Sequence, residues 1–232
     1  REAVLCEKPA VLSEDEARAI ASVSRECGVL FIEAMKNRFC PMRTRVKDLL
    51  ASGELGRIVS IESVQKLDYG ESPSGYLLDP LQGGCLYDMG CYAVGWFEDL
   101  LAGACDVSSR EVHWRDVPGG NVDWADDVHM SIGGVPIHMV CDGMAEYESR
   151  LTIICERGLL EIERLHRPEL AHVKYPDGQM LEINAPIEVD DFYGEIQHAT
   201  QLIQAGKLES SVMSLAATQR CAHIIDAIRL TL

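Results

Sequence analysis

The chain has 232 residues and a formal net charge of −16, from 37 acidic and 21 basic residues. This charge repels the phosphates of a nucleic acid, and no apolar run approaches the ~20 residues of a membrane-spanning helix. The composition therefore predicts a cytoplasmic protein that contacts neither nucleic acid nor a membrane.

The first elements alternate between strand and helix. Residues 2–6 and 29–35 read as short buried strands, and a helix between them begins after Ser13 and stops at Gly28. Glu16 stands three residues after Ser13, which is typical of a capping box. Strand, helix and strand in this order predict a parallel βαβ unit.

The rest of the chain favours strands. A helix begins at Pro41 and ends near Gly53, a strand starts at Ile58, residues 70–82 read as a loop, and a helix spans 84–102. Two amphipathic helices close the chain, at 191–205 and 211–230, on either side of Gly206. The pattern predicts a short α/β segment followed by an α+β part, a large and mostly antiparallel sheet with helices on one face. Its later strands are expected at 106–114, 126–133, 135–144, 149–157, 158–164, 170–176 and 180–184.

The nine cysteines form no C-x-x-C motif, and most lie inside apolar runs. This pattern favours buried free thiols over a disulfide framework. No Cys/His pair has the spacing of a zinc site, so we expect no metal. We expect His113, His129 and His138 to be structural or surface residues, because no carboxylate recurs beside them at fixed spacing.

Lys8 directly follows the first strand and precedes Pro9. Ligands of α/β folds bind at the carboxyl ends of strands, and proline holds the preceding residue in an extended conformation. Lys8 could therefore point into a binding site. Alternatively, it is a surface lysine paired with Glu7.

The stretch GGCLYDMGCYAVGWF, residues 83–97, reads as a core helix that carries two polar side chains on one face. Asp88 and Tyr92 are four residues apart, so a helix places them side by side. A buried carboxylate requires a partner, and Asp88 lies too far into the helix to be its N-cap. The pair is either functional or satisfied by nearby backbone.

Four stretches together, LCEKPAVLSEDEARAI, FIEAMKNRFCP, LASGELGRIVSIES and GGCLYDMGCYAV, resemble the glucose–fructose oxidoreductase/inositol dehydrogenase (Gfo/Idh/MocA) family. The similarity is greatest to its branch of dimeric dihydrodiol dehydrogenase and xylose dehydrogenase. The resemblance implies that residues 1–34 are the C-terminal remnant of a Rossmann domain and that residues 35–232 form a substrate-binding and dimerisation domain. No G-x-G-x-x-G motif occurs, so the dinucleotide site is expected to be incomplete, which we attribute to truncation.

The family also implies roles for individual residues. Lys8 would contact the substrate hydroxyl close to the nicotinamide ring of NAD or NADP, with Glu7, Pro9 and Arg38 beside the cofactor. Tyr92 would be the acid/base residue, its phenolate favoured by the ammonium of Lys8. Asp88 would orient or bind the substrate. Tyr76 is either a substrate contact or a loop aromatic that covers the core.

These roles predict an NAD(P)-dependent oxidoreductase that transfers hydride to or from a hydroxyl carbon of a sugar, polyol or cyclic diol. The alternative is a non-enzymatic regulatory or orphan dimerisation domain of the same fold that has lost cofactor binding. A pure regulator would have no reason to keep Lys8, Asp88 and Tyr92. We expect a homodimer or tetramer through the open sheet face, because residues 135–144 read as apolar on both faces.

Overall fold

The computed structural model describes residues 2–73 and 75–231. At its N-terminal end, β1 (Val4–Glu7) and β2 (Phe31–Ala34) pair in parallel, and α1 (Glu14–Cys27) connects them. Ser13 accepts a hydrogen bond from the backbone N–H of Glu16 at 3.3 Å, and Gly28 ends α1 with a φ of 58°. The predicted strand–helix–strand unit and both helix signals are confirmed. The first strand was expected to be buried, however, and β1 is largely exposed, with Val4 and Leu5 both on the surface.

The second part contains an eight-stranded sheet in the order β10-β9-β8-β7-β3-β6-β5-β4. Its strands are β3 (Ile58–Lys66), β4 (Cys105–Val117), β5 (Gly120–Ile132), β6 (Val135–Asp142), β7 (Glu148–Cys155), β8 (Gly158–Glu163), β9 (Leu170–Lys174) and β10 (Met180–Asn184). All neighbours are antiparallel except β3 and β6. The mostly antiparallel sheet is confirmed, but β3 lies in its middle, whereas pairing in chain order would leave it at an edge.

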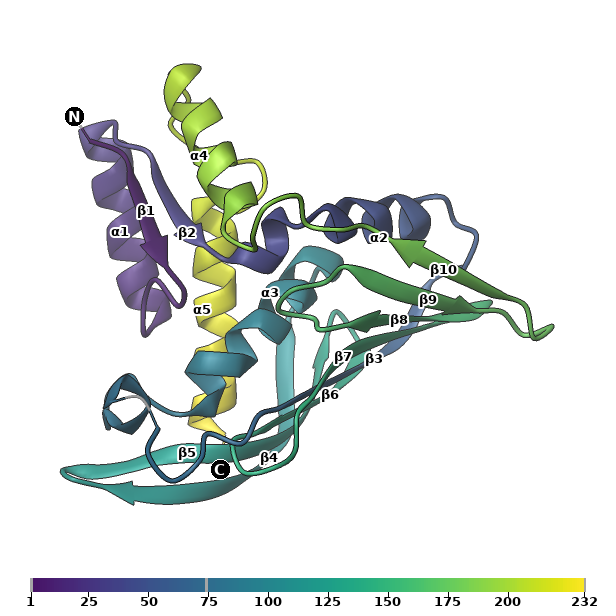
Figure 1. Ribbon diagram of the computed structural model, residues 1–232. Helices are drawn as coiled ribbons and strands as arrows, with labels where there is room; N and C mark the ends of the chain where they lie inside the picture. Colours follow the sequence, from purple (N-terminus) through teal and green to yellow (C-terminus); the bar gives the residue numbers. More distant parts are fainter. Residues whose placement is uncertain (1, 74, 232) are drawn as a thin grey trace.

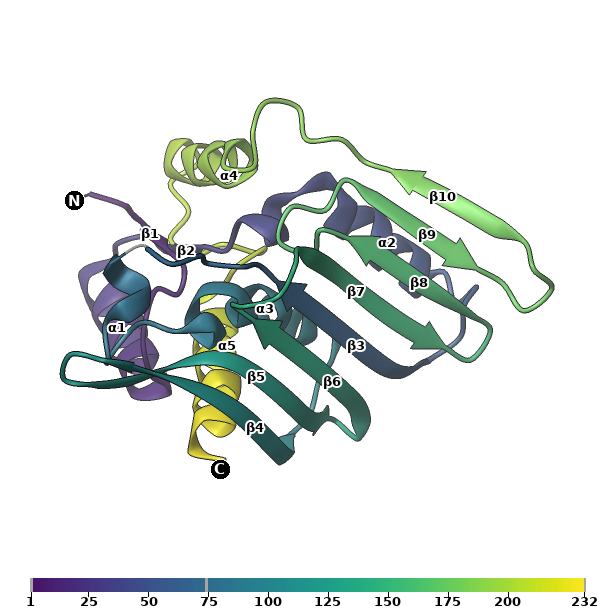
Figure 2. The same ribbon diagram turned by 60° about the horizontal axis from the view of Figure 1, so that its bottom comes forward.

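The helices of this part lie on one face of the sheet (Figure 1). They are α2 (Pro41–Ala51), a π turn (Leu86–Gly90), α3 (Cys91–Leu100), α4 (Tyr193–Gln204), α5 (Leu215–Leu230) and the short 3₁₀ helices η1 (Lys36–Phe39) and η2 (Gly75–Leu78). In Figure 2 the other face of the sheet comes forward, and none of the helices described here covers it.

The hairpin of β4 and β5 is longer than the sequence indicated. Residues 115–125 were predicted as neither strand, yet both strands continue to a two-residue turn at Pro118 and Gly119. Gly119 has a φ of 93°, a left-handed conformation that glycine adopts without strain. The alternation in this segment is obscured because Val122, Asp123 and Trp124 are all buried in succession.

The core lies between the sheet and the helices. Trp96 and Phe97 of α3 are almost fully buried, together with Ile224 and Ile228 of α5. The indole N–H of Trp96 donates to the carbonyl of Leu165 at 2.9 Å, which satisfies its one polar atom. The helix that carries Asp88 and Tyr92 is therefore fixed firmly to the sheet.

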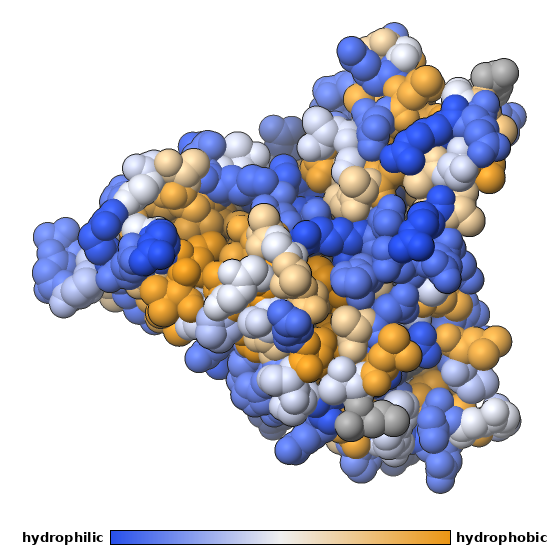
Figure 3. All heavy atoms as spheres, turned by 180° about the vertical axis from the view of Figure 1, so that it is seen from behind, coloured by the Kyte–Doolittle hydropathy of each residue, from blue (hydrophilic) through white to orange (hydrophobic). Residues whose placement is uncertain are grey.

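The uncovered face is less apolar than expected. On β6 its residues are Pro136, His138, Val140 and Asp142, since the alternate residues are buried toward the helices. Figure 3 shows a different side of the molecule, the one turned away in Figure 1, where hydrophobic and hydrophilic residues are also mixed. On β6 this face therefore carries two apolar residues, Pro136 and Val140, and two polar ones, so the strand is not apolar on both faces as expected.

The prediction of buried free thiols is confirmed for six cysteines, namely Cys40, Cys85, Cys91, Cys141, Cys155 and Cys221. No helix among residues 2–73 and 75–231 is long and apolar enough to cross a membrane.

Candidate active site

Lys8 lies where the sequence predicted, directly after β1. The backbone N–H of Ala10 donates to Glu33 Oε1 of β2 at 3.0 Å, which holds the turn that contains Lys8 and Pro9 against the parallel pair. Glu33 is buried, and burial raises its pKa. This contact fixes the direction in which Lys8 leaves the strand, toward the π turn.

Asp88 occupies the middle of that π turn, where a regular helix was predicted. Lys8 Nζ donates to its backbone carbonyl at 2.6 Å and to its Oδ1 at 3.2 Å. The hydroxyls of Tyr69 and Tyr76 donate to Oδ2 at 2.8 Å and to Oδ1 at 3.1 Å. The carboxylate thus has a complete set of partners, which answers why an apolar helix can carry it.

Gly84 makes the approach to the π turn possible. It has a φ of 94°, and a Cβ at this position would lie 2.3 Å from Asp123 Oδ1. Cys85 follows in a fully buried position, close to Asp123 and Asp126. Glycine is needed here for both its conformation and the close contact.

Tyr92 lies one helical turn beyond Asp88 and packs against Lys8. Lys8 Nζ is 4.6 Å from the centroid of the ring, the geometry of a cation–π contact. Its hydroxyl has no hydrogen-bond partner among the described residues, and Tyr92 lines a cavity of about 210 Å³. The phenol is therefore free to bond with a molecule in that cavity.

The protonation of Tyr92 differs from expectation. Burial raises its pKa, and the opposing effect of Lys8 is smaller, so the net shift is upward. Burial alone would lower the pKa of Lys8, but its electrostatic interactions with Cys91, Tyr92 and Asp88, together with its hydrogen bond to Asp88, outweigh that effect and raise it. At neutral pH the site holds a charged ammonium and a neutral phenol, where the sequence argument expected the ammonium to favour phenolate.

Two cavities meet at Lys8 and Asp88, because both residues line each of them. The cavity of about 210 Å³ lies toward the sheet, and the other, of about 230 Å³, lies along the end of β1. In addition to Lys8 and Asp88, the first cavity is lined by Gln65, Lys66, Leu67, Met89, Tyr92, Tyr147, Glu148, Ser149 and His166. In addition to the same two residues, the second cavity is lined by Glu7, Pro9, Leu12, Tyr76, Gln82, Gly84 and Tyr87.

His166 stands beside Tyr92, with 6.0 Å between the ring centroids. Its Nδ1 is 3.2 Å from Ser149 Oγ. Burial, together with the positive charge of Lys36, lowers the pKa of His166 to about 4. A neutral imidazole therefore lines the cavity at neutral pH and can accept or donate a hydrogen bond.

Lys36 is a second ammonium near Tyr92 that the sequence argument did not select. Its Nζ lies 5.7 Å from the centroid of the Tyr92 ring and 2.5 Å from Asp191 Oδ2. Lys36 closely follows the carboxyl end of β2, as Lys8 follows that of β1. The signal that identified Lys8 could therefore have identified Lys36 as well.

Glu195 of α4 is a buried carboxyl near Lys36. It is only 2% exposed, and its Oε2 has no hydrogen-bond partner. Burial and the charge of Glu7 raise its pKa from 4.5 to about 8, although Lys36 opposes the shift. The folded protein therefore holds a proton here that the unfolded chain releases at lower pH.

We expect Glu195→Gln to remove part of the pH dependence of stability. Because the folded-state pKa is raised, the wild-type free energy of unfolding falls as pH rises from about 4.5 through 8. The variant should match wild type at pH 5 and exceed it by roughly 1–3 kcal/mol at pH 9. Urea unfolding at both pH values measures this, with exposed Glu188→Gln as the matched control. Parallel curves for wild type and Glu195→Gln would contradict the assignment.

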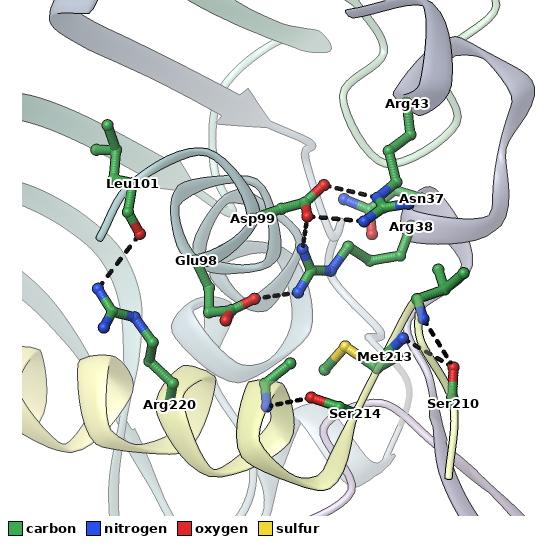
Figure 4. A network of polar contacts seen from close by, with 12 residues as sticks. Asn37, Arg38, Arg43, Glu98, Asp99, Leu101, Ser210, Met213, Ser214 and Arg220 are labelled. Atoms are coloured by element: carbon green, nitrogen blue, oxygen red, sulfur yellow. Dashed lines mark hydrogen bonds and ion pairs between the residues drawn. The ribbon is translucent and has the colours of Figure 1, made fainter. Parts of the chain in front are cut away.

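Arg38 was predicted beside the cofactor, but the structure does not bring it to Lys8. Its side chain is 3% exposed and pairs with Glu98 and Asp99 of α3, and Arg43 binds the same Asp99 (Figure 4). The guanidinium therefore joins η1 and α2 to α3. Arg38 lines neither of the two cavities at Lys8.

The other predicted residues do line the two cavities. Glu7 and Pro9 lie at the end of β1, in the second cavity. Tyr76 is 56% exposed and bonds Asp88, so it does not cover the core, which was one of the two alternatives. Tyr69 was missed, because it lies in the loop after β3, where the sequence carries no periodic signal.

Comparison with known proteins agrees with this architecture. The sequence model of the GFO/IDH/MocA C-terminal domain matches residues 44–161. A 3-ketoreductase from Actinomadura kijaniata, solved with NADP and TDP-benzene, has the same fold, with a TM-score of 0.85 and 21% identity over 98% of this chain and 70% of its own.

Curated relatives extend over most of the chain. D-xylose 1-dehydrogenase (NADP(+)) 2 of Haloferax volcanii is 41% identical over 190 residues, 81% of this chain and 50% of its own length. scyllo-Inositol 2-dehydrogenase (NADP(+)) IolU of Bacillus subtilis is 26% identical over 97% of this chain and 69% of its own length. The chain thus spans between half and about two thirds of the length of these relatives, and it belongs to the Gfo/Idh/MocA family, whose C-terminal domain it contains.

Proposed function

We propose that this chain is the catalytic and substrate-binding part of an NAD(P)-dependent oxidoreductase that acts on a hydroxyl carbon of a sugar, polyol or cyclic diol. One observation carries the proposal: Lys8, Asp88 and Tyr92 meet at a cavity although the end of β1, the π turn and α3 supply them. Ammonium, carboxylate and phenol are the groups that the proton transfer of such a reaction needs.

Oxidation of a secondary alcohol removes a hydride from carbon and a proton from oxygen. A nicotinamide supplies the hydride chemistry when bound. Lys8 is a permanent cation under these conditions, so it stabilises negative charge on the substrate oxygen but does not act as a base. We assign the exchange of a proton with that oxygen to Tyr92, whose hydroxyl has no hydrogen-bond partner among the described residues.

The raised pKa of Tyr92 indicates which direction of the reaction, oxidation or reduction, the site favours. A neutral phenol is a proton donor, so the chain as it stands is prepared to protonate the oxygen of a carbonyl that accepts hydride. In the opposite direction Tyr92 must first lose its own proton. We infer that reduction is the direction that the site favours near neutral pH.

Asp88 positions Lys8 relative to Tyr92. Its carbonyl and Oδ1 hold Lys8 Nζ, and Tyr69 and Tyr76 fix the carboxylate in turn. The ammonium is thus held above the ring of Tyr92 without any bond to its hydroxyl. We assign Asp88 the orienting role and leave the phenol for substrate.

The residues present fit the nicotinamide end of a cofactor but not its phosphates. The cavity of about 230 Å³ beside Glu7, Lys8 and Pro9 has room for a flat ring near the ammonium. The chain has no G-x-G-x-x-G motif to bind a diphosphate. We infer that residues 1–34 belong to a dinucleotide-binding domain and contribute the nicotinamide end of its site.

The first cavity suits a polyhydroxylated substrate. Gln65, Ser149 and Glu148 line it along with neutral His166, and these groups offer donors and acceptors to hydroxyls. The relatives named above are dehydrogenases of xylose and scyllo-inositol with NADP, and a bovine relative, 25% identical, is trans-1,2-dihydrobenzene-1,2-diol dehydrogenase. These names support a small hydroxylated substrate and favour NADP.

The product of the complete coding sequence tests the proposal. We expect it to oxidise or form at least one member of a panel of aldoses, inositols and cyclic diols, followed by the absorbance of reduced nicotinamide with NAD and NADP separately. If the protein binds NAD or NADP but turns over no member of the panel, the proposal is contradicted. A homodimer or tetramer and a cytoplasmic location stay predictions.

A further inference from the structure

A group of two histidines and one carboxylate lies on the uncovered face of the sheet, far along the sequence from Lys8. Asp127 and His129 are two residues apart on β5, so they share a face, while Val128 between them is buried toward the helices. His138 of β6 is directly opposite His129 in the antiparallel register. The strand pairing therefore places all three side chains together on the face that Figure 2 brings forward.

The three ligand atoms are close to one another. Asp127 Oδ1 is 2.8 Å from His138 Nε2 and 3.7 Å from His129 Nε2. One carboxylate oxygen of Asp127 and one ring nitrogen each of His129 and His138 all lie within 4.8 Å of one another. The two imidazole rings are stacked, with centroids 4.3 Å apart and an interplanar angle of 1°.

We propose that Asp127, His129 and His138 bind a divalent transition-metal ion, with zinc as the best match. A tetrahedral zinc ion with ligand distances of about 2.0–2.1 Å separates its ligand atoms by roughly 3.4 Å. The two distances from Asp127 Oδ1 lie on either side of that value. A small rotation of two exposed rings would direct their nitrogens at one ion.

The donor set selects the class of ion. Imidazole nitrogens suit zinc, copper and nickel, whereas calcium and magnesium prefer oxygen ligands alone. The chain carries a formal net charge of −16, and Glu62 of β3 is the register partner of His138 on its other side, so the local field attracts cations. The pairing of β5 with β6 brings these residues together. Their spacing in the sequence therefore does not resemble that of a zinc motif.

The side chains leave room for further ligands. Those of Asp127, His129 and His138 are 48%, 57% and 39% exposed. Three protein ligands would leave a fourth position of the ion open to water. An ion here would link β5 to β6 across their ladder on the uncovered face.

Isothermal titration of untagged, metal-free protein with zinc chloride tests the site. We expect saturation at about one ion per chain and a rise in melting temperature when zinc is added. His129→Ala, His138→Ala and Asp127→Asn should each weaken binding by at least ~10-fold. His113→Ala is the matched control, because His113 is an exposed histidine of β4 outside the group, and it should bind zinc like wild type.

Thermal unfolding without zinc confirms that the variants fold, which their exposed positions favour. Wild-type protein that binds no zinc would overturn the proposal. So would a double variant His129→Ala/His138→Ala that keeps wild-type affinity, since the ion would then lie elsewhere. Equal losses in His113→Ala and His138→Ala would also contradict it.

Discussion

Tyr92→Phe is expected to lower the turnover of the complete enzyme by at least ~100-fold, the scale of a lost acid/base group. The change removes only the hydroxyl, which has no hydrogen-bond partner among the described residues and faces the cavity. The ring keeps its contacts with Lys8 and His166. Stability should therefore change little, and the loss should appear in kcat more than in KM.

A matched variant separates this loss from a general effect of removing a phenol. Tyr175 lies in the turn between β9 and β10, outside both cavities, and its hydroxyl donates to Glu54 in the loop before β3. Tyr175→Phe should keep wild-type kcat and KM. If Tyr92→Phe retains wild-type kcat as well, Tyr92 is not the proton-transfer group.

Lys8→Ala should also cost at least ~100-fold in kcat/KM, because it removes the cation that stabilises charge on the substrate oxygen. The side chain of Lys8 is 12% exposed and donates twice to Asp88, so its loss also removes a buried charge contact. Tyr69 and Tyr76 still bind Asp88, and they should keep the π turn in place.

Two controls separate a catalytic role of Lys8 from a structural contact with Asp88. Lys8→Ala should melt cooperatively within a few degrees of wild type, and exposed Lys207→Ala should leave activity and stability unchanged. A folded Lys8→Ala enzyme with wild-type kcat/KM would show that Lys8 is only a structural partner of Asp88.

The fold could be predicted from the sequence where the signals are local. Ser13, Glu16 and Gly28 bound α1 because caps depend on neighbouring residues. Strand periodicity likewise revealed a mostly antiparallel sheet. It could not place β3 between β6 and β7, because a central position depends on partners far along the chain. It also missed much of the β4–β5 hairpin, where successive buried residues hide the alternation.

The site was predictable for residues with an unusual local setting. Lys8 stands out after a strand, and Asp88 and Tyr92 stand out in an apolar helix, and the structure brings them together. Two properties could not be read this way. The burial of Tyr92 decides the direction of its pKa shift, and the acidic pair on α3 decides that Arg38 is held away from Lys8.

Residues that act only through tertiary contact gave no signal. Tyr69 reaches Asp88 from a loop, and His166 reaches Tyr92 from the connection between β8 and β9. The group of Asp127, His129 and His138 exists only because of strand register, so the sequence argument expected no metal there.

The double variant Lys8→Ala/Tyr92→Phe tests the central claim most directly, which is that the two side chains form one catalytic unit. Groups that act together in a single step are not additive, so the double variant should lose about as much kcat/KM as the worse single variant. A loss equal to the product of the two single losses would show that Lys8 and Tyr92 act independently, and would contradict the account.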